Sequence, residues 1–180
     1  MADLVNTRTI AILLTSMSLL APSATRAEQY ESGIKSWDVN GKKLTMVAGV
    51  LTDNARLYYL NYSFYLQGKD RLLLQVPLVN DKTKPDGYKL SFSTFNGGGE
   101  IISDAKVVVK RDQVYLLTAH KNALHGYGRP GSIETKTYRL VEGDEAEWRS
   151  YFSAITQKEY SASQNYSVER SLDELARDLR

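Results

Sequence analysis

The sequence predicts a mainly β fold, an antiparallel sandwich or barrel-like sheet of about eight strands with one or two C-terminal helices. Short segments in which apolar and polar residues alternate recur between Ser36 and Val141, and residues typical of turns separate them. Only after Gly143 do the apolar residues take the spacing of a helix. Strands joined by short turns form antiparallel sheets, which bury their apolar faces by packing in two layers or by curling.

We expect residues 1–27 to be a cleavable signal peptide. A basic residue precedes an apolar run over residues 10–21, and a proline and several small residues follow it. This order is typical of secretory signals, and the run is shorter than the roughly 20 apolar residues of a membrane-spanning helix. We therefore expect an exported, periplasmic protein with no stable membrane span after cleavage. Residues 28–180 would form a single β-rich domain with a C-terminal helical extension.

Two turn signals organise the first half of the predicted sheet. Asn40-Gly41 separates two alternating segments, 36–39 and 43–51, and this dipeptide favours a type I′ hairpin turn because both positions need a positive φ. A three-residue loop that begins with a glycine joins the strands predicted at 56–67 and 71–79. We therefore expect two hairpins in this part of the chain.

The second half of the predicted sheet contains four more strands. Pro-Asp-Gly, a run of three glycines, Arg-Asp and a glycine-rich loop lie before or between them, and such residues mark turns. The predicted ranges are 88–95, 100–110, 114–120 and 133–141.

The first of two helices is expected immediately after Gly143. Asp144 is suited to cap it, and Trp148, Phe152 and Ile155 recur at helical spacing.

The second expected helix carries a single apolar stripe, and Ser171 with Glu174 forms a capping box near its start. The stripe consists of Val168, Leu172, Leu175, Ala176 and Leu179. Such a stripe must be covered, and we expect it to lie on the chain's own sheet; a partner chain is the alternative.

The amino-acid composition excludes several kinds of catalytic and metal-binding chemistry but does not identify the function. The chain has no cysteine, two histidines (His120 and His125) and a formal net charge of +2. These counts exclude disulfides, cysteine-ligated zinc and thiol catalysis, and they argue against a histidine-rich metal site. A nearly balanced charge gives no electrostatic basis for nucleic-acid binding. We expect no metal, no cofactor, no catalytic residues and no nucleic-acid partner.

Two motif matches are judged to be coincidental. Ser32 to Lys35 matches S-x-x-K, but Gly33 follows the serine and the motif precedes a strand rather than opening a helix. The glycine-rich loop 126–131 matches G-x-G-x-x-G, but no β-α-β unit surrounds it. What remains is a mobile, basic and aromatic loop, which is either a binding loop or an ordinary connector.

Tyrosine is the least ordinary feature of the composition, with twelve tyrosines against four phenylalanines. Alternation along the third strand places two sets of residues on opposite faces. The first set, Tyr58, Leu60, Tyr62, Phe64 and Leu66, is expected to face the core; the second is Leu57, Tyr59, Asn61, Ser63 and Tyr65. The second set suits a contact surface, although β-sheets favour tyrosine in any case. The predicted binding residues are Tyr59, Tyr65, Tyr127 and Arg129.

These features favour an exported, non-enzymatic, self-associating (homodimeric) protein that protects its host by binding a small molecule. One alternative is a periplasmic immunity protein or inhibitor that blocks a cell-wall-targeting toxin or hydrolase. A second is a hydrolase with dispersed residues, for which Ser32, His120 and His125 are candidates. A third is a structural subunit that assembles through an exposed strand or the C-terminal helix.

In overall layout the chain resembles the periplasmic carbapenem intrinsic-resistance proteins of the CarG type. The resemblance lies in size, in the exported all-β organisation and in the lack of a β-lactamase signature. It implies resistance to a β-lactam antibiotic by sequestration rather than hydrolysis. The expected partner is therefore a small-molecule antibiotic, or a protein toxin under the immunity alternative.

Overall fold

The computed structural model describes residues 30–53, 57–68, 71–84, 86–124, 126–143 and 149–179. The predicted signal peptide, His125, Asp144 and Trp148 lie outside the described residues. The described elements are, in chain order, β1 (Gly33–Val39), β2 (Lys42–Asp53), β3 (Leu57–Gln67), β4 (Leu73–Gln75), β5 (Leu78–Val79), β6 (Tyr88–Lys89), β7 (Ser91–Ser93), β8 (Phe95–Gly97), β9 (Glu100–Lys110), β10 (Gln113–Lys121), β11 (Ile133–Glu142), β12 (Ser150–Tyr160), a 3-10 turn (Ala162–Gln164) and α1 (Val168–Asp178).

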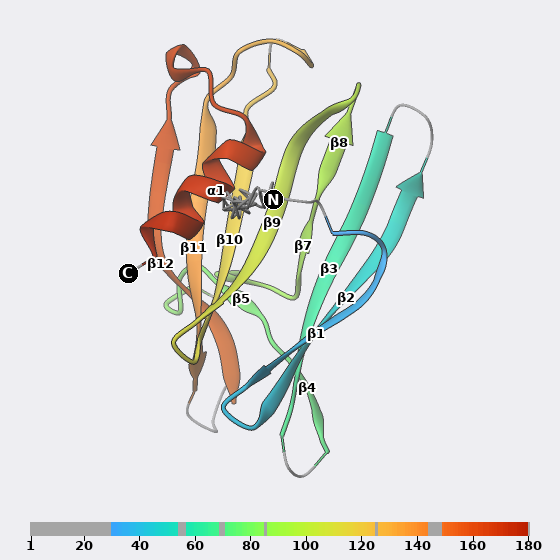
Figure 1. Cartoon of the computed structure of the whole chain (residues 1–180), viewed down its shortest axis with the longest axis vertical. Coiled ribbons are helices and arrows are strands. Elements are labelled where there is room, and N and C mark those ends of the chain that lie inside the picture. Colours follow the sequence, from blue (N-terminus) through green and yellow to red (C-terminus); the bar gives the residue numbers. More distant parts are fainter. Residues whose placement is uncertain are drawn as a thin grey trace, which may run out of the picture.

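The described strands form one sheet that folds back on itself into two layers (Figure 1). The first layer contains β1, β2 and β3, and β4 and β7 pair with β3. Strand β8 pairs with both β3 and β9 and so joins this layer to the second, which runs from β9 to β12 and on to β5 and β6. The pairing of β5 with β12 is parallel. The predicted class, a mainly β sandwich-like fold with a C-terminal helix, is confirmed.

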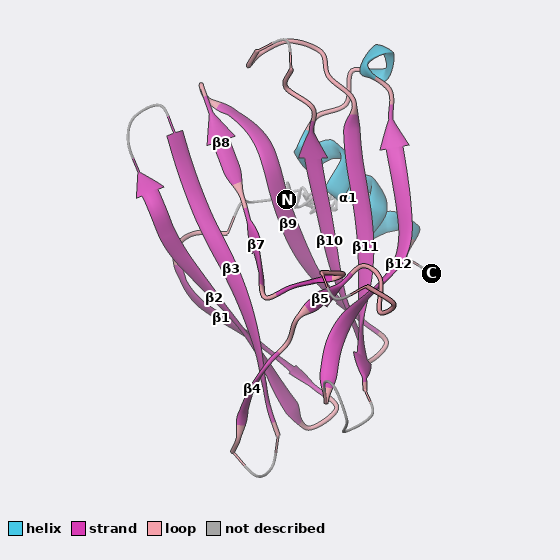
Figure 2. Ribbon diagram, turned by 180° about the vertical axis from the view of Figure 1, so that it is seen from behind, coloured by secondary structure: helices cyan, strands magenta, loops and turns pink. Residues whose placement is uncertain are grey.

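Two apolar cores stabilise this arrangement, one on each side of the second layer. The first lies between the two layers and includes Leu44, Met46, Leu60, Tyr62, Phe64, Leu116 and Phe152. The second lies between the second layer and α1 and includes Leu117, Ala119, Ile133, Tyr160, Val168, Leu172 and Leu175. Strand β10 contributes to both cores because its two faces are both covered. Seen from behind, α1 lies on the far side of β10 and β11 (Figure 2).

The local signals in the sequence produce the predicted hairpins. Asn40 and Gly41 both have positive φ, 49° and 72°, and β1 pairs with β2 in register around them. In β3 the predicted core face is buried from Leu60 to Leu66, while Tyr59 and Tyr65 on the other face are half-buried. The apolar stripe of α1 covers the chain's own sheet, as expected.

The first predicted helix is wrong, because residues 150–160 form strand β12. This strand pairs with β11 over its whole length and supplies a neighbour for an edge that would otherwise be open. Phe152 is fully buried in the first core, whereas Ile155 is exposed. Aromatic and β-branched residues favour a strand here, and their helix-like spacing is coincidental.

Three further boundaries differ from the prediction. The strand expected at 71–79 is divided into β4 and β5, and the carbonyl of Pro77 between them accepts a hydrogen bond from the Phe152 N–H at 2.8 Å. The strand expected at 88–95 is divided into β6, β7 and the start of β8. Helix α1 begins one turn before the predicted capping box: Ser167 is the cap, and the hydroxyl of Ser171 donates to the Val168 carbonyl inside the helix.

No helix within the described part of the chain is both long enough and apolar enough to cross a membrane.

Candidate functional site

A polar cleft of about 470 Å³ lies between β7 on one side and β9, β10 and β11 on the other. It forms where the inner face of the second layer changes from apolar to polar. Toward one end of β10 this face carries Val114 and Leu116, which are buried in the first core. Toward the other end it carries Thr118 and His120, which pair across the sheet with Lys136 and Glu134. The cleft is lined by Leu78, Asn80, Lys89, Ser91, Phe92, Ser93, Ser103, Thr118, Ala119, His120, Glu134, Lys136 and Tyr138.

Four polar side chains in this cleft have no hydrogen-bond or ion-pair partner among the described residues: Lys89, Ser91, Thr118 and His120. Thr118 is 7% exposed, so its hydroxyl is largely removed from bulk water. A buried polar group normally finds a partner, because leaving it unpaired costs about 1–3 kcal/mol. The cleft therefore offers several unpaired groups to a polar ligand.

The charge of the cleft favours an anion. The residues that line the cleft include two lysines, Lys89 and Lys136, and one glutamate, Glu134. Lys136 and Glu134 form an ion pair at 3.1 Å, so the amine of Lys89 has no carboxylate partner among the described residues of the cleft. Burial raises the pKa of Tyr138 to about 12, and the nearby Glu134 adds to this effect. Tyr138 therefore stays neutral near pH 7 and donates a hydrogen bond to Asn80 Oδ1 at 2.7 Å.

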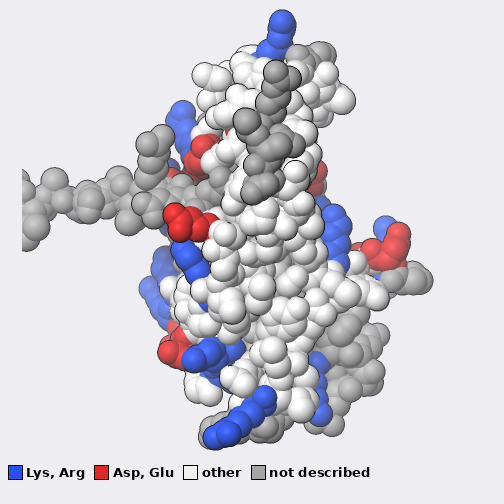
Figure 3. Space-filling view, turned by 90° about the vertical axis from the view of Figure 1, so that its right-hand side faces the viewer, with Lys and Arg blue, Asp and Glu red and all other residues white. Residues whose placement is uncertain are grey.

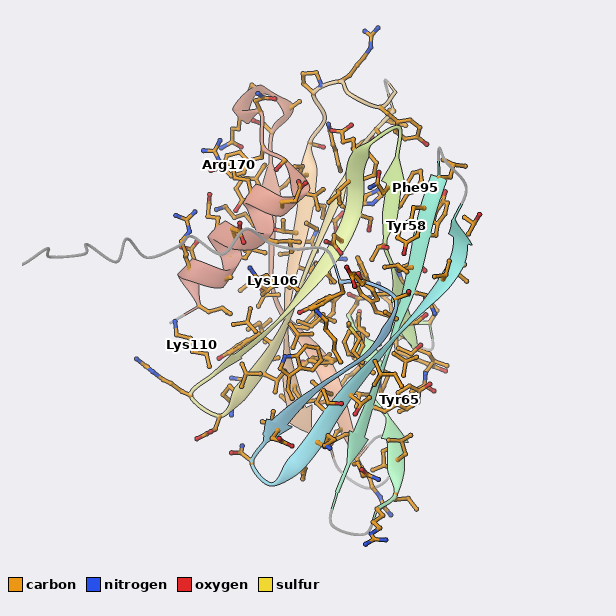
Figure 4. The ribbon with its side chains drawn as sticks, turned by 45° about the vertical axis from the view of Figure 1, so that its right-hand side comes forward. Tyr58, Tyr65, Phe95, Lys106, Lys110 and Arg170 are labelled. Atoms are coloured by element: carbon orange, nitrogen blue, oxygen red, sulfur yellow. The ribbon has the colours of Figure 1, made fainter. Side chains whose placement is uncertain are left out.

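A ladder of three aromatic rings lies next to the cleft. Tyr59 stacks on Phe95 with ring centroids 4.5 Å apart and planes inclined by 8°. The ring of Tyr127 meets Phe95 edge to face at 5.8 Å. Phe95 is the cross-strand partner of Ser103, which lines the cleft, so the ladder and the cleft meet at this pair. Figure 4 shows Phe95 and Tyr58 at one end of the first layer.

The carboxylate of Glu100 on β9 contacts both the glycine-rich loop after β10 and the last residue of β10. Oε2 of Glu100 accepts a hydrogen bond from the Gly128 N–H at 2.7 Å, and Oε1 forms an ion pair with Lys121. Partial burial of Glu100 opposes its charge, but these two contacts outweigh that effect and hold its pKa below the usual value. The carboxylate therefore ties the loop to β9.

The structure brings together two of the four predicted binding residues, Tyr59 and Tyr127. Tyr65 lies on the same face of β3 as Tyr59 but six residues along it, which is about 20 Å in a strand. Figure 4 shows Tyr65 at the opposite end of the layer from Phe95. Arg129 is exposed and makes no polar contact with a described residue.

Of the residues considered for hydrolysis, the structure describes Ser32 and His120. His120 lines the cleft, whereas Ser32 is exposed just before β1 and does not line it. Within the described ranges, no three histidine, aspartate or glutamate side chains are grouped so that they could hold a metal ion.

Sequence reasoning missed Lys89, Thr118, Phe95 and Glu100. Alternation along β10 places Thr118 and His120 on one face, and this pattern could have indicated a polar end of the strand. Nothing local indicates that β6 brings Lys89 to the same place, because β6 joins the second layer through β5.

The outer face of the first layer is a second, flatter feature. Figure 3 shows this side of the molecule, where uncharged residues occupy the centre and charged residues lie at the margins. Ile34 and Val47 are cross-strand partners on it, and they are 73% and 37% exposed.

A smaller hollow of about 370 Å³ lies at the other end of the sandwich. Its apolar lining includes Val39, Leu66 and Leu140, and an ion pair between Lys42 and Glu142 closes one side. The polar cleft is the stronger candidate because it combines unpaired donors with the neighbouring aromatic ladder.

No protein-family model matches the chain, and no curated protein matches it. Among solved structures, the crystal structure of CarG has a similar fold, with a TM-score of 0.61 at 16% sequence identity. The match covers 85% of this chain and 94% of that chain. At this identity the likeness shows the fold, and it confirms the resemblance to the CarG type.

Proposed function

We propose that this protein binds a β-lactam antibiotic of the carbapenem class in the polar cleft and protects its host by sequestering the antibiotic without hydrolysing it. The observation that carries the proposal is the set of groups in the cleft that have no partner among the described residues, above all the amine of Lys89, which lines the same cleft as Thr118 and His120. The choice of a carbapenem follows from the resemblance to the carbapenem intrinsic-resistance proteins, with which the similarity in fold to CarG agrees.

The chemistry of a carbapenem matches these groups. The molecule carries a carboxylate on one ring of its bicyclic core and a lactam carbonyl in the other ring, and both groups flank the shared ring nitrogen. A carboxylate pairs well with a lysine amine, and hydrogen bonds to charged groups are the stronger ones in proteins. The carbonyl accepts hydrogen bonds from hydroxyl donors such as those of Ser91 and Thr118. A volume of about 470 Å³ is in the range of small-molecule sites.

The proposed place of action is the periplasm. The order of residue types over residues 1–27 supports export through a cleavable signal. A binding protein in that compartment meets the antibiotic before it reaches the enzymes of cell-wall synthesis, so capture alone is protective if the protein is abundant.

Calorimetric titration of the purified protein with a carbapenem, followed by intact mass measurement, tests the proposal. We expect saturable, stoichiometric binding, an unchanged protein mass and recovery of the intact antibiotic on denaturation. An added ligand mass or loss of the lactam ring would instead support covalent or hydrolytic chemistry. Absence of binding at millimolar antibiotic would overturn the proposal.

The outer face of the first layer favours a second candidate, an immunity protein that blocks a cell-wall-targeting toxin. The face is uncharged at its centre and exposes Ile34 and Val47, which suits a protein interface or a homodimer contact. Under this alternative, Val47→Lys removes protection of producing cells while carbapenem titration of the wild type shows no binding. Sedimentation of Val47→Lys against the wild type separates a partner interface from self-association.

A further inference from the structure

The ring of Tyr127 packs against the backbone of glycine residues, which carry no side chain that would displace it. A Cβ atom added to Gly97 would lie 3.0 Å from both Cε1 and Cζ of this ring, and one added to Gly98 would lie 3.5 Å from its Cδ2. The ring therefore spans Gly97, the last residue of β8, and Gly98, which follows it. Gly97 is buried, whereas Tyr127 is 48% exposed. One side of the ring thus faces the glycine backbone, and the side away from it is open to solvent.

The ring is also held from its edges and through its loop. Phe95 meets it edge to face at 5.8 Å and is itself stacked on Tyr59. Glu100 binds the N–H of Gly128, the residue immediately after Tyr127. Lys121, at the start of the loop, is paired with the same carboxylate and is 7% exposed in its side chain. An exposed aromatic ring in a loop with several glycines is therefore fixed in one place.

The open ring lies close to the cleft. Gly97 pairs with Glu100 and Phe95 pairs with Ser103, so the turn that carries the ring and the wall of the cleft are about 10 Å apart along β9. A ligand of ordinary small-molecule size reaches from one to the other.

We propose that Tyr127 is a stacking platform for an aromatic ring of the ligand, and that Glu100 is the positioning residue that holds it. The proposal rests on the cleft as the ligand site, but it does not require the ligand to be a β-lactam. The cleft takes an anionic group, and the platform takes a planar ring attached to it. The site thus prefers anions that carry an aromatic substituent.

Ligand-observed NMR with 5-phenylpentanoate and 5-cyclohexylpentanoate tests the platform, because their extended chains are long enough to reach from the cleft to the ring. The two acids share one charge and a similar size but differ in the planarity of the ring. We expect the wild type to bind 5-phenylpentanoate about five-fold more tightly, which is the effect of one aromatic contact. Equal affinity for the two acids, or no binding of either in the millimolar range, would overturn the proposal.

Variants test whether the ring of Tyr127 causes the preference for the aromatic acid. Tyr127→Ala and Tyr127→Leu should both abolish this preference. The leucine variant keeps an apolar group over Gly97 in case the alanine variant loses its fold. Tyr127→Phe should keep it. Tyr65→Ala, a matched removal of a tyrosine from the same layer far from the cleft, should leave it unchanged. A preference that survives in Tyr127→Leu contradicts the platform.

Glu100→Gln tests the positioning role. Glutamine cannot form an ion pair with Lys121, and its neutral amide oxygen accepts a weaker hydrogen bond from the Gly128 N–H than a carboxylate does. We expect the amide resonance of Gly128 to shift and the preference for 5-phenylpentanoate to fall, while the affinity for 5-cyclohexylpentanoate stays unchanged. A lost preference with an unmoved Gly128 resonance would contradict the positioning role. Failure of a carbapenem to bind, together with an intact preference for 5-phenylpentanoate, contradicts the proposed function and supports the platform.

Discussion

The hydroxyl of Tyr30 forms hydrogen bonds with the backbone N–H and carbonyl of Val107, which a neighbouring strand would otherwise form. It accepts a hydrogen bond from the Val107 N–H at 3.0 Å and donates one to the Val107 carbonyl at 3.5 Å. Strand β8 pairs with β9 only as far as Ser103, so within the described residues the rest of this edge of β9 has no strand beside it. Tyr30 also packs against Tyr62 and Trp37, which anchors the chain ahead of β1 in the first core.

Tyr30→Phe tests this contact. The variant keeps the ring but leaves the Val107 N–H without a partner, and Val107 is 7% exposed. We expect the free energy of unfolding to fall by about 1–3 kcal/mol, the cost of an unpaired buried donor. Urea denaturation measures it. Tyr65→Phe is the control and should change stability by less than about 0.5 kcal/mol; equal effects of the two variants would refute the role of the Tyr30 hydroxyl.

Asp104 should make the protein less stable as the pH rises toward neutrality. Burial raises its pKa to about 7, because the hydrogen bonds from the Ala105 N–H and the Tyr62 hydroxyl do not offset the loss of water and the charge of Glu169 adds to it. Between about pH 4 and 7 the folded state therefore holds a proton that the unfolded state has lost. The contribution of Asp104 to the free energy of unfolding is therefore greatest below about pH 4 and falls between about pH 4 and pH 7.

Asp104→Asn should remove that dependence. The amide can still accept both hydrogen bonds and carries no charge, so the variant should exceed the wild type at pH 8 by on the order of 1–4 kcal/mol and match it near pH 4. Denaturation at both pH values gives the comparison. A wild-type advantage at pH 8 would mean that the Asp104 charge is stabilised by contacts not described above.

Glu174 should show the opposite dependence on pH. Its carboxylate accepts hydrogen bonds from Lys158 at 2.8 Å, Tyr166 at 2.6 Å and Tyr160 at 3.0 Å. The bond from Lys158 is the largest of the effects that lower its pKa to about 2. The stabilising effect is therefore complete above about pH 4.5 and is lost as the pH falls through about 2.

Glu174→Gln measures this effect. Because the Glu174 side chain is 22% exposed and solvent screens its charge, we expect the melting temperature at pH 7 to fall by only about 1–3 °C, with no difference from the wild type near pH 2. Thermal unfolding followed by circular dichroism is sufficient. A difference that persists at pH 2 would show that the carboxylate charge is not the cause.

Lys89→Met should weaken binding of a carbapenem about tenfold or more. The substitution removes the uncompensated amine of the cleft while keeping a side chain of similar length, and a charged hydrogen bond contributes about 1.5–3 kcal/mol. Calorimetric titration gives the affinity. Lys43→Met, on the exposed side of β2, is the matched control and should bind as the wild type does; the same loss in both variants would indicate a general effect of charge.

Gly97→Ala should displace Tyr127 rather than unfold the protein. The new methyl group would lie 2.9 Å from Cζ of Phe95 and 3.0 Å from the ring of Tyr127, and both are ends of side chains that can move. We expect a loss of about 1–2 kcal/mol and greater exposure of Tyr127 to chemical iodination. Gly49→Ala, where no atom lies within 4 Å of the added group, is the control. Unchanged exposure of Tyr127 in Gly97→Ala would show that the ring does not depend on the glycine.

Local signals in the sequence determined those parts of the fold that are held by contacts between residues close together in the chain. Asn40-Gly41 specifies a hairpin because its two backbone conformations are strongly selected. Alternation along β3 specifies which face of the strand is buried, namely the face that carries Tyr62 and Phe64. The stripe from Val168 to Leu179 specifies the covered face of α1. The resemblance in layout to the CarG type also came from the sequence.

Only the tertiary structure decided which residues from different strands meet. Alternation puts Tyr59 and Tyr65 on one face of β3. It does not show that Phe95 stacks on Tyr59 and contacts Tyr127, while Tyr65 lies apart from these rings. Residues 150–160 form a strand because β11 provides an edge that needs a partner. The cleft exists because β6 returns to the second layer with Lys89. These contacts join residues far apart in the chain, so their energies depend on the assembled layers and leave no pattern in any local segment.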